Sequence, residues 1–311
     1  MIKIQYPNQQ TLDTYFDEIK IELLKKIRYI KSQKDISIDK KKFRITNKIK
    51  KIVVWLENEN NLKKLIQFKP NELASLIENV YKKFPKSHYK KESLNRIFYR
   101  IFVDYGYDNL DKLKFIQNIN LGSCPYCNRN YIFNINKKGS IKPEIDHLYP
   151  KSIYPYLAVS YFNLIPSCPT CNGFGAKEGK DTFYIYPISN PYELNENDFK
   201  FSISPENIDF FNIESKKYDF NSFEIELYGN KANLEIFKLE ELYKQHKDIV
   251  LELLIKKAYY PKSYIEELKK FGFTEDEIYR YLLCNYKQDK DLQKRPLSKL
   301  IKDISEELGI L

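Results

Sequence analysis

The sequence predicts a mainly helical fold that is interrupted near its middle by one small module of a β-hairpin and a short helix. Apolar residues recur at helical spacing over much of the first 120 residues and again from about residue 232. Between these regions lie two Cys-x-x-Cys pairs. The segment that separates the pairs alternates apolar and polar residues, as half-buried strands do.

The composition narrows the choice of compartment and partner. The 311 residues carry 52 Lys and Arg against 42 Asp and Glu, a formal net charge of +10. This surplus favours a polyanion such as nucleic acid, although the codon usage of an AT-rich genome also enriches lysine. No apolar run approaches the ~20 residues of a membrane span, and the opening segment lacks the pattern of a secretory signal. We therefore expect a cytoplasmic protein with no membrane partner.

The N-terminal region, residues 1–120, is expected to be helical. Three apolar stripes predict helices over about 12–30, 73–84 and 94–105. Segment 31–51 between the first two holds nine Lys and Arg against two Asp. Such a run fits either a solvated loop or a surface that binds nucleic acid without reading its sequence.

The cysteines predict a structural zinc site. Cys124 and Cys127 form the first pair, and Cys168 and Cys171 form the second after 40 intervening residues. Together they offer four thiolates to one tetrahedral ion and leave no open position, so the pattern is that of one structural Zn²⁺ per chain. Cys284 lies outside this pattern, and we expect it to be a buried free thiol.

The loop between the cysteine pairs predicts a β-hairpin. Residues 130–136 and 140–147 are expected to be its strands, with a Lys-Lys-Gly turn between them. Asp146 and His147 would then stand at the end of the second strand. An irregular stretch follows, and a short helix is expected to start near Cys168.

Residues 186–311 are expected to hold a further β-hairpin near 199–228 and then helices. Segment 187–192 reads as a linker into this region. Thr274 and Glu277 have the spacing of a helix capping box. Pro296 is expected to open the last helix and Gly309 to end it.

The chemistry that these residue types allow is phosphodiester hydrolysis. Carboxylate and amide oxygens of Asp146 and Asn172 suit Mg²⁺, which binds oxygen ligands and phosphates. A neutral imidazole at His147 can accept a proton from an attacking water. Such a reaction requires no side-chain nucleophile.

Three segments carry a family resemblance. They read Cys-Pro-Tyr-Cys at 124–127, Ile-Asp-His-x-x-Pro-Lys-Ser at 145–152, and Tyr-Phe-Asn-Leu-Ile-Pro-x-Cys-x-x-Cys-Asn at 161–172. Together they resemble the HNH endonucleases of the His-Me finger (ββα-metal) superfamily, in its zinc-stapled branch. The resemblance covers roughly residues 121–183 and places the nuclease module at about 121–185.

The resemblance implies a metal-dependent endonuclease that cuts DNA. It implies that His147 is the general base and that Asp146 and Asn172 bind a catalytic Mg²⁺ or Mn²⁺. It also implies that Asn163 holds the intervening loop closed by hydrogen bonds.

Four basic side chains near these motifs are candidates for phosphate contacts, with simple solubility as the alternative. They are Lys151, Lys177, Lys180 and Arg129.

Similar modules occur as the nuclease subunit of bacterial defence systems such as Septu, beside an ATPase. We therefore expect a partner ATPase, and a homo-oligomer would allow both strands to be cut. The alternative function is a catalytically silent, zinc-stapled nucleic-acid-binding protein.

Overall fold

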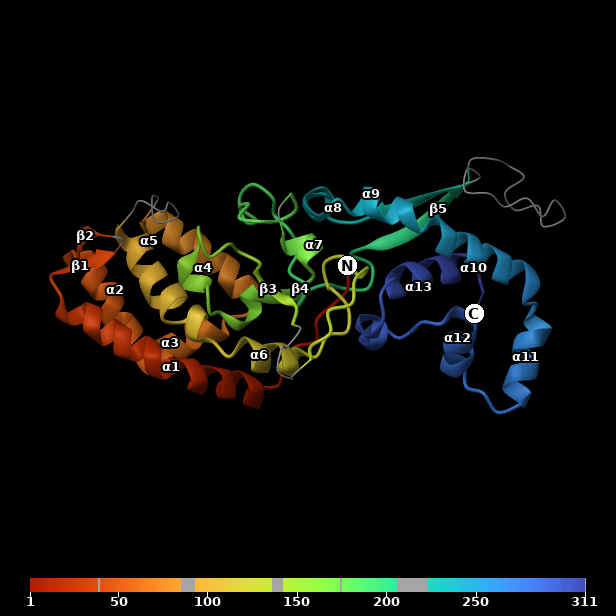
Figure 1. Cartoon of the computed structure of the whole chain (residues 1–311), viewed down its shortest axis with the longest axis horizontal. Helices are drawn as coiled ribbons and strands as arrows, with labels where there is room; N and C mark the ends of the chain where they lie inside the picture. Colours follow the sequence, from red (N-terminus) through yellow and green to blue (C-terminus); the bar gives the residue numbers. More distant parts are fainter. Residues whose placement is uncertain (39, 85–92, 136–141, 174, 206–222, 311) are drawn as a thin grey trace.

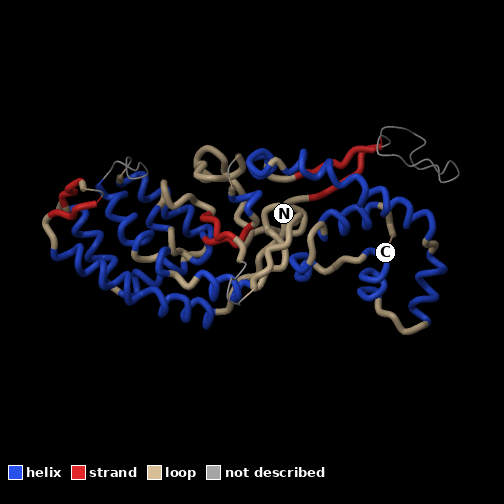
Figure 2. Tube along the Cα trace, in the orientation of Figure 1, coloured by secondary structure: helices blue, strands red, loops and turns tan. Residues whose placement is uncertain are grey.

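The computed structural model describes residues 1–38, 40–84, 93–135, 142–173, 175–205 and 223–310. The molecule is elongated, with helices α1–α5 at one end, α10–α13 at the other, and the paired strands β3 and β4 between them (Figure 1). The fold is mainly helical, as predicted, and its described strands form three antiparallel pairs (Figure 2).

The first part of the chain contains α1 (Gln9–Ser32), β1 (Asp35–Ile38), β2 (Lys41–Arg44), α2 (Asn47–Glu57), α3 (Glu59–Gln67), α4 (Pro70–Lys83), α5 (Ser93–Phe98) and α6 (Lys112–Ile119). The middle contains β3 (Glu144–His147), β4 (Leu164–Ser167) and α7 (Pro169–Asn172). The last part contains β5 (Lys200–Pro205), β6 (Phe223–Tyr228), α8 (Lys231–Phe237), α9 (Leu239–Tyr243), α10 (Lys247–Tyr259), α11 (Lys262–Lys270), α12 (Glu275–Leu283) and α13 (Ser298–Glu307).

The N-terminal helices form where the apolar stripes predict them. The side chain of Asn8 caps α1, and the helix buries its apolar stripe against α2 and α3. The basic segment 31–51 is not simply a loop, because strands β1 and β2 pair within it. Ile36 and Ile38 of β1 are buried. Lys41 and Lys42 of β2 are exposed at the surface.

The strand that carries Asp146 and His147 has a different partner from the predicted one. β3 pairs with β4, which places Asp146 opposite Ile165. Residues 130–135 form no strand with β3, and Tyr131 makes only an isolated bridge to Ser123. All four β4 residues are buried, and a short apolar run of this kind lacks the alternation that reveals a half-buried strand. The predicted turn at 137–139 lies outside the described residues.

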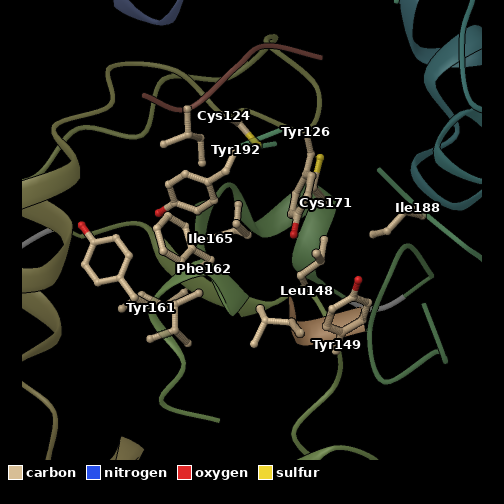
Figure 3. Close-up of a cluster of buried hydrophobic side chains, with 14 of the residues drawn as sticks. Cys124, Tyr126, Leu148, Tyr149, Tyr161, Phe162, Ile165, Cys171, Ile188 and Tyr192 are labelled. Atoms are coloured by element: carbon tan, nitrogen blue, oxygen red, sulfur yellow. The ribbon is translucent and has the colours of Figure 1, made fainter. Parts of the chain in front are cut away.

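An aromatic core surrounds this strand pair (Figure 3). Tyr126, Tyr161, Phe162 and Tyr192 are all fully buried within it. The rings of Phe162 and Tyr192 lie 5.0 Å apart in an edge-to-face arrangement. Ile188, Asn190 and Tyr192 of segment 187–192 are buried, so most of this segment belongs to the core rather than to a linker.

The C-terminal region matches the prediction closely. β5 and β6 form the expected hairpin, and Thr274 and Glu277 form the expected capping box at the start of α12. α13 packs against β5, where Asp303 accepts a hydrogen bond from the Phe201 backbone (2.9 Å). Among the described helices, none has the length and apolar character needed to cross a membrane.

Candidate functional site

The four paired cysteines converge in the centre of the molecule. All four are buried, and their Sγ atoms lie within 4.8 Å of one another. The Sγ atoms of Cys127 and Cys168 are 3.9 Å apart. Zn–S bonds of about 2.3 Å in a tetrahedron require sulfur separations of about 3.8 Å. The cluster can therefore hold a metal ion such as zinc.

Nitrogen donors surround these sulfur atoms, as metal-binding thiolates require. Backbone N–H groups of Cys168 and Arg129 donate to Cys124 Sγ and Cys127 Sγ, each at 3.4 Å. Cys284, expected to be buried, is instead exposed at the C-terminal end of α12.

The cysteine cluster connects directly to the predicted catalytic residues. Cys168 is the N-cap of α7, so the second pair fixes the start of this short helix. Tyr126, between the first two cysteines, donates its hydroxyl to Asp146 Oδ2 (2.7 Å). Tyr126 is fully buried. This hydrogen bond connects the cysteine cluster to the Asp146 carboxylate.

A pocket of about 600 Å³ lies where β3 and α7 meet. Asp146, His147 and Asn172 line it, and so do Lys151 and Lys177. Other residues of its wall include Tyr107, Lys112, Glu144 and Ser152. The structure therefore brings three of the four predicted catalytic side chains into one pocket.

The remaining predicted residues lie outside this wall. Asn163 is buried behind it. Arg129 donates from Nε to Nε2 of His246 (2.9 Å), so it has a protein partner rather than a free position at the pocket. Lys180 lies near the ring of Tyr186, with its Nζ 5.8 Å from the centroid.

The hydrogen bonds of His147 define its tautomer. Its Nε2 lies 3.0 Å from the backbone carbonyl of Ala158. A carbonyl only accepts, so Nε2 carries the proton and the neutral ring presents Nδ1 as an acceptor. Burial, and then the charge of Lys151, hold the pKa of His147 well below its usual value. The imidazole is therefore neutral at pH 7, with Nδ1 unprotonated.

Asp146 and Lys177 form a buried ion pair. The Nζ of Lys177 donates to Asp146 Oδ1 (2.8 Å) and to the backbone carbonyl of His147 (2.6 Å). Both side chains are almost completely buried, with 1% of the area exposed for Lys177 and 3% for Asp146. Lys177 is thus a support for the pocket, in contrast to the surface phosphate contact that its sequence position suggested.

Asn163 ties together both ends of the loop between β3 and β4. Its Oδ1 accepts from the Tyr149 backbone N–H (2.8 Å). Its Nδ2 donates to the carbonyls of Tyr149 (3.2 Å) and Leu157 (3.0 Å). The amide satisfies three buried backbone groups, which holds the loop against the strands.

Asn172 is oriented by a neighbour on β3. Its Nδ2 donates to Glu144 Oε2 at 2.7 Å. With the amide nitrogen engaged in this bond, Oδ1 is the atom of the amide that remains able to bind a cation. The sequence placed Glu144 on the same strand as Asp146, but its bond to Asn172 depends on the packing of α7 on β3.

Comparison with known proteins gives a match over a short stretch of the chain. No protein-family description and no solved structure matches it. Over 48 residues, 15% of the chain, it is 46% identical to the Septu protein PtuB of Bacillus thuringiensis. The match spans 18% of the length of that relative.

Proposed function

We propose that the chain is a metal-dependent HNH endonuclease that hydrolyses DNA phosphodiester bonds. The observation that carries this proposal is the neutral imidazole of His147, which shares a basic pocket with the oxygens of Asp146 and Asn172. A base and two hard oxygen donors are the groups that metal-assisted hydrolysis of a phosphate requires.

The oxygens of Asp146 and Asn172 would hold the catalytic Mg²⁺ or Mn²⁺. Each Asp146 oxygen accepts one hydrogen bond, from Tyr126 and from Lys177. An ionised carboxylate offers about four lone-pair sites, so each oxygen can still bind a cation. A bound ion would stabilise the negative charge on the scissile phosphate and its leaving oxygen.

His147 would accept the proton of the attacking water at Nδ1. The carbonyl of Ala158 fixes the ring through Nε2, and the ring of Tyr107 packs against it with centroids 4.4 Å apart. These contacts hold the imidazole in one orientation before substrate binds, so little reorganisation is needed during the reaction.

A defence role alongside an ATPase is the second part of the proposal. The partial similarity to the Septu protein PtuB supports it. The chain contains no phosphate-binding P-loop motif of its own. In this proposal an ATP-dependent step would come from a partner subunit, and two copies of the chain would supply sites for both DNA strands.

One observation favours the alternative, a catalytically silent DNA-binding protein. The ammonium of Lys177 already neutralises Asp146 inside the protein. While that pair persists, the carboxylate attracts Mg²⁺ more weakly than an unpaired carboxylate would.

The two proposals are separated by nicking of supercoiled plasmid. Zinc-loaded full-length protein is incubated with plasmid and added Mg²⁺ or Mn²⁺, alone and with a co-purified partner. The nuclease proposal predicts open-circular product from the wild type and none from Asp146→Ala, with DNA binding retained by both. Binding without nicking under every condition would support the silent protein.

A further inference from the structure

A second basic pocket lies in the N-terminal helical part of the molecule. It has a volume of about 460 Å³ and is formed by α1, β1 and the segment that follows α5. Its described wall contains Lys25, Lys26 and Arg100, two tyrosines, and no Asp or Glu. Lys25 lies 3.8 Å from a carboxylate oxygen of Glu22, and Arg100 lies 2.6 Å from one of Asp104. Lys26 therefore supplies the charge that this wall can offer to an anion.

Lys26 is held in this pocket by aromatic rings. Its Nζ lies 4.4 Å from the ring centroid of Tyr29 and 4.3 Å from that of Tyr105. Across the described chain, no carboxylate oxygen comes within 4.0 Å of this Nζ. On the same helix, Lys20 and Lys31 have carboxylates at 2.8 and 2.6 Å. The rings position the charge of Lys26 without neutralising it.

The same arrangement recurs beside the candidate active site. Lys112 and Lys151 place their Nζ atoms 4.4 and 4.3 Å from the ring centroid of Tyr107. Neither has a carboxylate oxygen within 4.0 Å among the residues the structure describes. Both lysines line the pocket that contains His147.

The two tyrosines connect the pockets. Only Gly106 separates Tyr105 from Tyr107, so their Cα atoms lie at most about 7 Å apart. Arg100 adds a fourth cation at 5.0 Å from the Tyr105 ring, beside its ion pair with Asp104 (2.6 Å). It belongs to a π-helical segment, Tyr99–Asp104, and such segments are frequent at functional sites.

We propose that these cations bind successive phosphates of one DNA backbone, which runs from the active-site pocket past Tyr107 and Tyr105 to Lys26. The inference rests on the proposed function, because it assumes that the scissile phosphate lies near His147. The exposed Lys41 and Lys42 of the adjacent β1–β2 hairpin extend the positive surface beyond the second pocket. A row of cations along one surface suits a polymer of phosphates, whereas a lone phosphate would occupy one pocket.

The test measures DNA binding and does not depend on cleavage. Zinc-loaded full-length protein is titrated into fluorescent duplex DNA without added divalent cation, over a range of salt concentrations. Lys26→Gln should reduce the slope of log affinity against log salt by about 1, the value for one lost phosphate contact. Lys26→Arg should keep the wild-type slope because it keeps the charge.

Lys20→Gln is the matched control, since it removes the same charge from the same helix outside the pocket. Its slope should equal that of the wild type. The proposed DNA path would be overturned if Lys26→Gln left the slope unchanged, or if both variants reduced the slope equally. Displacement of the duplex by a mononucleotide at equal concentration would also overturn it. Failure of plasmid nicking with the Lys26 effect intact would instead count against the nuclease proposal alone.

Discussion

Single residues of this site serve both the fold and the proposed chemistry. The sequence motifs predicted that Asp146, His147 and Asn172 lie close together, and the structure places all three at one pocket. The motifs did not predict that Tyr126 and Lys177 hold Asp146, or that Glu144 holds Asn172. These partners follow from how the cysteine pairs and α7 pack on β3, which no local pattern encodes.

Replacing Lys177 by Met is expected to destabilise the protein. The change leaves Asp146 charged and buried, and breaking a buried pair from one side costs about 3–5 kcal/mol. Denaturant unfolding measures the loss. Lys180→Met is the control, since Lys180 has no carboxylate within 4.0 Å in the described structure. Equal stability of the two variants would contradict the role of the pair.

Two asparagines of the site should respond differently to replacement by Ala. Asn163→Ala removes the partner of three buried backbone groups and should cost about 3 kcal/mol of unfolding free energy. Asn172→Ala should cost about 0.5 kcal/mol or less, because it loses one accessible hydrogen bond, yet it should abolish nicking. Thermal unfolding and plasmid nicking of both variants check these expectations. An Asn163→Ala protein as stable as the wild type would refute the structural role of Asn163.

At the scale of elements, the helices and strands whose sequences have a clear hydrophobic periodicity were predicted well. The stripes of α1 and α4, the β5–β6 hairpin and the α12 cap all form where expected. The pairing of β3 with β4 was missed because β4 is a four-residue run buried on both faces. The packing of the surrounding core determines which strand β4 pairs with. The sequence of β4 itself does not alternate between apolar and polar residues.

Gly106 is expected to control how the segment of Tyr105 and Tyr107 packs on the site. A Cβ there would lie 2.5 Å from the Phe102 carbonyl oxygen and 2.9 Å from Val159 Cγ1. Gly106→Ala should therefore lower unfolding free energy by about 1–3 kcal/mol. Gly179→Ala, whose Cβ would meet nothing closer than 3.8 Å, should have a much smaller effect. Calorimetry that ranks the two variants the other way would refute the close approach.

At the scale of the whole molecule, the cysteine cluster joins parts of the chain that are distant in sequence. Asn128, next to the first pair, accepts hydrogen bonds at Oδ1 from Ser298 (3.0 Å) and from the Lys299 backbone (3.0 Å). Tyr243 donates to the carbonyl of Cys127. Loss of the metal should therefore disturb the C-terminal helices as well as the site.

Cys168→Ser is expected to abolish tight binding of about one zinc ion per chain and to lower the melting temperature strongly, because metal binding contributes directly to folding. Cys284→Ser is the matched control, since Cys284 is exposed and outside the cluster. It should retain zinc and wild-type stability. Elemental analysis and thermal unfolding provide the readout. Full zinc content in Cys168→Ser would contradict the assignment of the ligands.

The most direct test of the central claim compares two histidine variants in the plasmid-nicking assay, at equal zinc content and with saturating Mg²⁺. His147→Ala removes the proposed base, whereas His246→Ala removes a half-buried histidine that bonds to Arg129 outside the pocket. We predict that His246→Ala nicks plasmid like the wild type and that His147→Ala does not, while both bind DNA. Nicking by His147→Ala at the wild-type rate would contradict the account.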